Sequence, residues 1–72
     1  MSFKIKATSI MGWPVWVVSI GEPIDVGGSI ERPVKMINSE HQGQVFETHA
    51  QAAEILPFVL KVRPDAIIVD AP

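Results

Sequence analysis

Apolar and polar side chains alternate along the first part of the chain. The odd-numbered positions from Phe3 to Ala7 are apolar, and the even-numbered positions beside them are lysine or threonine. Alternation with a period of two and one charged side is typical of a half-buried β-strand, which we expect over residues 3–10. Gly12 and Pro14 then interrupt the pattern and indicate a turn.

Residues 15–20 give the strongest strand signal in the chain. The segment reads VWVVSI, so it is dense in β-branched and aromatic residues, and both of its sides are apolar. Together with the first segment it predicts an antiparallel hairpin.

The middle of the chain is richer in turn-forming residues. Residues 21–33 contain three glycines and two prolines, which predicts a long loop with a short edge strand near residues 24–26. Residues 34–37 predict a third strand, and residues 44–46 resume an extended pattern. Residues 34–46 are therefore a second hairpin or one interrupted strand.

A helix is predicted over residues 48–62. Thr48 is a favourable N-cap, and Gln51 three residues later completes a capping-box pattern. Pro57 falls on the polar side of this helix, where it either bends one helix or divides two short ones. Pro64 ends the element. An apolar stripe at helical spacing is formed by Ala52, Ile55, Leu56, Val59, Leu60 and Val62.

The apolar run at residues 66–69 predicts a final buried strand. Residues 44–46, the helix and this strand form a βαβ pattern, whose crossover is expected to be right-handed and to make the two strands parallel. The sequence thus predicts one α+β domain over residues 1–72. Its small mixed β-sheet contains a hairpin, a third strand or hairpin and the final strand, with one amphipathic helix on one face.

The size and composition of the chain favour a second chain as a partner. The sequence has 72 residues, 47% of them hydrophobic, and no cysteine. A core this small usually needs a disulfide, a metal or a partner for stability, and cysteine-based solutions are excluded. Without a long apolar stretch at the N-terminus or a run of ~20 apolar residues, we expect a cytoplasmic protein with no membrane association.

The distribution of apolar residues indicates where such a partner binds. One helix covers one face of a sheet, yet residues 15–20 and 66–69 are apolar on both faces. We therefore expect a homodimer or one dedicated protein partner on the second face; the alternative is that the 21–33 loop folds back over it. The interface residues we predict are Trp13, Trp16, Val18, Phe58, Ile67 and Val69.

A single-stranded nucleic-acid binder is the alternative function. Aromatic and basic side chains on a sheet can stack on bases and contact phosphates. The net charge of −2 argues against this partner. The surface that it would use comprises Lys4, Lys6, Trp13, Trp16, Arg32 and Lys35.

The chemistry-bearing residues form no recognisable catalytic or metal-binding motif. His41 and His49 lack the spacing of metal ligands, there is no cysteine nucleophile, and no pair of carboxylates is selected by its spacing. We expect no cofactor and no enzymatic activity. The sequence favours a non-catalytic protein–protein interaction or modulator module that self-associates, a function that suits a small accessory protein of a bacterium, phage or mobile element.

Overall fold

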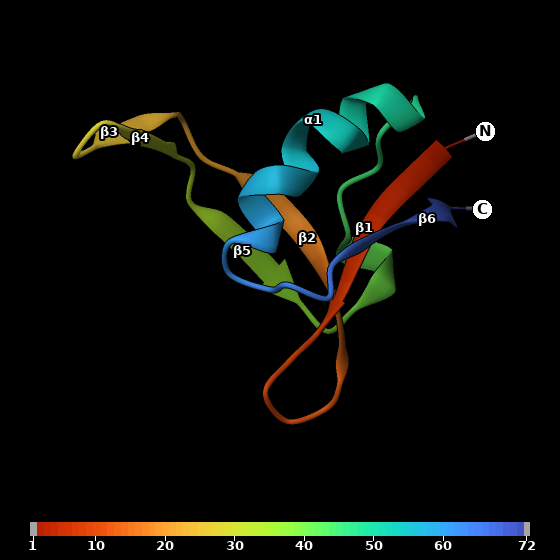
Figure 1. Ribbon diagram of the computed structural model, residues 1–72. Helices are drawn as coiled ribbons and strands as arrows, with labels where there is room; N and C mark the ends of the chain where they lie inside the picture. The colour runs from red at the N-terminus through yellow and green to blue at the C-terminus, as the bar shows by residue number, and fades with distance from the viewer. Residues whose placement is uncertain (1, 72) are drawn as a thin grey trace.

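The computed structural model describes residues 2–71 and shows a small α+β fold, as expected (Figure 1). Its sheets contain four and two strands, and one α-helix packs against the larger sheet. The elements are β1 (Ser2–Thr8), β2 (Pro14–Ile20), β3 (Ile24–Val26), β4 (Ser29–Glu31), β5 (Val34–Ile37), the 3₁₀ helix η1 (Glu40–Gln42), α1 (His49–Leu60) and β6 (Ile67–Ala71).

The larger sheet has the strand order β5-β2-β1-β6, and every neighbouring pair is antiparallel. β1 lies at the centre, where Lys6 is opposite both Trp16 of β2 and Ile67 of β6. β5 and β6 form the two edges. Among residues 2–71 the sheet has no parallel pair of strands, so the expectation that it is mixed is wrong in this respect.

The segment around Phe46 explains this difference. Phe46 makes a single antiparallel bridge to Phe3, with N–H···O distances of 2.9 and 2.8 Å between the two residues. Gln44 donates to the carbonyl of Val17 at 2.7 Å. The segment thus fits between β1 and β2, while β6 lies on the other side of β1. It runs parallel to β6, as the βαβ pattern predicts, but β1 separates the two.

The helix α1 confirms the local signals in the sequence. Thr48 Oγ1 accepts from the backbone N–H of Gln51 at 3.1 Å, and the Gln51 side chain accepts from the N–H of Thr48 at 3.3 Å. This reciprocal capping box satisfies two donors that the first helical turn leaves free. Pro57 lies inside one continuous helix with its side chain exposed, so it does not divide the element.

The core lies between α1 and one face of the sheet. Ile5, Val17 and Val59 are its largest fully buried side chains, and Ala52 of α1 is also completely buried. Alternation along the strands places the odd-numbered residues of β1 and the β2 residues Val15 and Val17 on this face. The same alternation directs Lys4, Lys6 and Trp16 to the opposite face.

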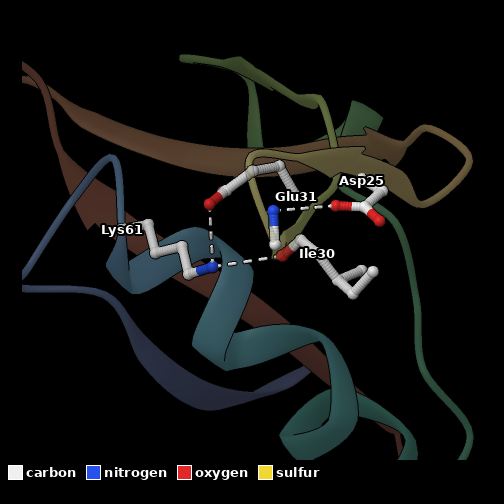
Figure 2. A network of polar contacts seen from close by, with 5 residues as sticks. Asp25, Ile30, Glu31 and Lys61 are labelled. Atoms are coloured by element: carbon white, nitrogen blue, oxygen red, sulfur yellow. Dashed lines mark hydrogen bonds and ion pairs between the residues drawn. The ribbon is translucent and has the colours of Figure 1, made fainter.

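Residues 24–31 form a second hairpin where the sequence predicts a loop with one short strand. Gly27 and Gly28 have φ angles of 58° and 90°, and a two-residue hairpin turn of the type I′ class needs positive φ at both positions. Lys61 at the end of α1 donates to the Ile30 carbonyl at 3.1 Å and pairs with Glu31 at 3.0 Å (Figure 2). The hairpin is therefore tied to the helix side, and the idea that this loop covers the second sheet face is wrong.

Candidate functional site

The sheet face opposite α1 carries most of the residues that the sequence selects for binding. We call this surface the open face. Strand register places Lys6 between Trp16 and Ile67, and Lys4 beside Val69. On the β5 side, Ile37 is opposite Trp16, and Lys35 is opposite Ser19. Val18 is half-buried where the register between β2 and β5 shifts.

One end of the open face is covered by η1 and the glycine that follows it. The Lys4 ammonium donates to the carbonyl of Glu40, and Lys4 is buried. A Cβ on Gly43 would lie 3.0 Å from Trp16 Cβ and 3.3 Å from Lys4 Cδ, so the backbone here packs directly on both side chains. Lys4 therefore holds η1 against the sheet, and its ammonium group is not free to bind a ligand.

The other end of the open face is uncovered by any described element. The Lys6 ammonium lies 5.9 Å from the centre of the Trp16 ring, within range of a cation–π interaction. Beside it, Ile67 of the edge strand β6 keeps 55% of its surface exposed. A basic side chain thus lies between two large apolar ones.

The turn between β1 and β2 projects beyond the sheet (Figure 1), and it carries exposed apolar side chains. Ile10, Met11 and Trp13, which we call the hairpin tip, are 92%, 78% and 60% exposed. Ser9 fixes the turn, because its N–H donates to the Trp13 carbonyl at 2.8 Å and its hydroxyl accepts from the Trp13 N–H at 3.1 Å. Gly12 has a φ of 87°, which favours glycine. The sequence pattern selected only Trp13 of these three residues.

Two predicted site residues lie elsewhere. The Arg32 guanidinium is 5.7 Å from the centre of the Phe58 ring, and the Lys61 ammonium is 5.8 Å from it. Arg32 also donates from Nε to the Gly21 carbonyl at 2.8 Å. Because these contacts join the β3–β4 hairpin to α1, they have a structural role. Phe58 and Arg32 thus lie on the helix side of the sheet and are not part of the open face.

The remaining features that could concern a ligand are a pocket on the helix side and the two histidines. A pocket of about 500 Å³ lies between Ile20, Arg32, the 44–47 segment and the first half of α1, and it is open to solvent. Among residues 2–71, no group of three or more histidine, aspartate or glutamate side chains is placed to hold a metal ion. His41 belongs to η1, whereas His49 packs edge-on against Phe3 at 5.6 Å in the first turn of α1.

No helix in the described part of the chain is long and apolar enough to cross a membrane. Comparison with protein-family models, with curated proteins and with solved structures found no match for this chain.

Proposed function

We propose that the protein is a non-catalytic protein–protein interaction module that associates with itself through the open side of its sheet, which comprises the open face and the edge strand β6. The observation that carries the proposal is the exposure of Ile67 on an edge strand, next to an open face that no described element fully covers. The hairpin tip adds three more exposed apolar side chains on the same hairpin as Lys6 and Trp16. Exposed apolar side chains gathered on one side of a soluble protein usually mark an interface.

The energetics favour association. Complete burial of an aliphatic side chain is worth about 1.5–3 kcal/mol, so even partial burial of Ile67 in each of two copies is a substantial contribution. Ile67 is held in a regular ladder with β1, and the hairpin tip is fixed by the hydrogen bonds of Ser9. Little backbone conformational entropy is therefore lost on association.

The non-catalytic part of the proposal follows from the chemistry of this surface. Isoleucine, methionine, valine and tryptophan side chains bind by exclusion of water, but they neither transfer protons nor attack a substrate. The ammonium groups on the face are Lys4, which is bound to Glu40, and the lysines at positions 6 and 35. A recognition surface accounts for these groups better than an active site does.

A single-stranded nucleic acid has weaker support as the partner. The Lys6–Trp16 stack is an arrangement that can receive a base and a phosphate. However, Lys4 is occupied by a backbone carbonyl, and Arg32 lies on the helix side. Two of the four basic residues predicted for that surface are thus lost to it, and the net charge is negative. A protein partner is the better-supported proposal.

The substitution Ile67→Asp tests the proposal. We expect it to weaken self-association at least tenfold, because it removes apolar burial worth more than about 1.4 kcal/mol over the two copies. The fold is expected to persist, since an aspartate here would lie opposite Lys6 and form a favourable cross-strand pair. The measurement is the dissociation constant by sedimentation equilibrium, with circular dichroism to verify folding.

Val26→Asp is the matched control, because Val26 is a strand residue of the β3–β4 hairpin that is exposed to 57%, against 55% for Ile67, and lies opposite the uncharged Ser29. It is expected to leave the dissociation constant unchanged. Equal effects of the two substitutions would show that the open side is not the contact surface.

A further inference from the structure

The two edges of the larger sheet differ in how they resist pairing with another strand. β5 carries Lys35, and its register with β2 shifts between Val17 and Ser19. Charged residues and bulges are the usual protections of an edge strand. β6 reads IIVDA and also carries one charged residue, Asp70, but in contrast to β5 its pairing with β1 continues without a shift along the whole strand. β6 is therefore the edge that is suited to receive a further strand.

The backbone groups that β6 directs outward follow from the pairing of β1. Phe3 exchanges hydrogen bonds with Phe46, on the side of β1 away from β6. Successive residues of a strand direct their N–H and C=O groups to opposite sides. The backbone groups of Lys4 and Lys6 therefore point toward β6, and those of their partners Val69 and Ile67 point toward β1. Ile68 and Asp70 consequently direct their N–H and C=O groups to the outer edge.

We propose that a second copy of this chain pairs with β6 in the antiparallel direction, about a two-fold axis that passes through Val69. This inference rests on the proposed self-association and specifies its geometry. Ile68 lies opposite Asp70 of the second copy, and Val69 lies opposite its own counterpart, so the whole of β6 is paired. The two four-stranded sheets become one sheet of eight strands, and their open faces become continuous.

The side chains fit this register. On the open face, Val69 meets the second copy's Val69, and Ile67 meets the second copy's Ala71, so every opposed pair is apolar. On the helix face, Asp70 is opposite Ile68 rather than another aspartate. Like charges are thus never directly opposed across the new ladder.

Face-to-face packing of two open faces fits less well. It would place Lys6 and Lys35 of one copy, together with their counterparts, in a dehydrated layer between the sheets. Burial of unpaired ammonium groups is unfavourable. Edge pairing leaves these lysines in water while it covers the outer side of Ile67.

A single cysteine at position 69 tests the geometry, because the chain contains no other cysteine. At a non-hydrogen-bonded antiparallel pair the Cα atoms are about 4.5 Å apart, which is within the range that a disulfide spans. We expect Val69→Cys to form a covalent dimer under mild oxidation. In the same register, two cysteines at position 67 would be offset by four residues, about 14 Å along the strand, so Ile67→Cys is expected to remain uncrosslinked.

Ile24→Cys, on the exposed β3–β4 hairpin, measures crosslinking by random collision. Preferential crosslinking of Val69→Cys over both other variants supports the edge-paired dimer. If the wild-type protein sediments as a dimer but Val69→Cys crosslinks no faster than Ile24→Cys, self-association stands and the edge geometry is wrong. If the wild-type protein sediments as a monomer, both proposals fall.

Discussion

Replacement of Ile5 by alanine is expected to remove a large share of the free energy of unfolding. Ile5 is completely buried at the centre of β1, opposite Ile68 of β6 and in the core that α1 covers. Truncation of such a side chain costs about 2–5 kcal/mol. A chain of this length has a stability on the order of 4–11 kcal/mol, so the loss takes a large share of it. The measurement is the midpoint of urea unfolding, followed by circular dichroism.

Two substitutions show whether the loss of stability in Ile5→Ala comes from the burial of Ile5 and not only from the smaller side chain. Ile5→Val removes one buried methylene and is expected to cost about 0.5–1.5 kcal/mol. Ile10→Ala removes the same atoms as Ile5→Ala from a hairpin tip that is almost fully exposed, so its midpoint is expected to stay at the wild-type value. A core placed elsewhere would be indicated if Ile5→Ala and Ile10→Ala unfolded at the same urea concentration.

The second large effect is expected for Asp70→Pro, which should abolish dimer formation while the monomer stays folded. In the edge-paired dimer, the Asp70 N–H donates to the carbonyl of Ile68 in the second copy, and proline removes this donor in both copies. Within one copy that N–H points away from β1, and proline is tolerated on an edge strand in this orientation. The Asp70 side chain is exposed, so its loss leaves the core intact.

Asp70→Ala is the control for the backbone effect. It removes the same carboxylate but keeps the N–H, so its dissociation constant is expected to equal that of the wild type or to be slightly lower. Sedimentation equilibrium separates the cases. A stable dimer of Asp70→Pro would contradict pairing through the β6 edge.

The elements whose signals are local could be predicted from the sequence. Thr48 and Gln51 specify the start of α1 by contacts within one turn, and the structure contains both halves of that capping box. The apolar density of residues 15–20 and 66–69 likewise marks β2 and β6. The sequence places Pro57 on the polar side of the helix, but that position permits both one continuous helix and two short ones, so only the structure shows that α1 is continuous.

The arrangement of the strands could not be predicted from local patterns. The βαβ pattern specifies that the Phe46 segment and β6 are parallel, but it does not say which strand lies between them. That place is taken by β1, which is distant in sequence and hydrogen-bonds to both. Of the β3–β4 hairpin, the short strand β3 was predicted and β4 was missed for a different reason: β4 is three residues long with a single apolar residue, too short to show a hydrophobic pattern.

The candidate site was predicted only in part, because alternation along a strand is a local signal, whereas contacts between distant segments are not. Alternation alone assigns Trp16, Ile67 and Val69 to the face opposite α1. It also assigns Lys4 there, but the contact of Lys4 with Glu40 depends on where η1 folds back over the sheet. Ile10 and Met11 were missed because alternation shows which side of a strand a residue faces, and it has no meaning in a turn.

The molar mass of the wild-type protein in solution, measured by light scattering over a range of concentrations, tests the central claim most directly. One chain has a mass of 7.9 kDa. Self-association through the open side predicts a mass that rises with concentration to twice this value and then stays constant, since a two-fold contact is closed. A constant mass of 7.9 kDa at every concentration would contradict the account.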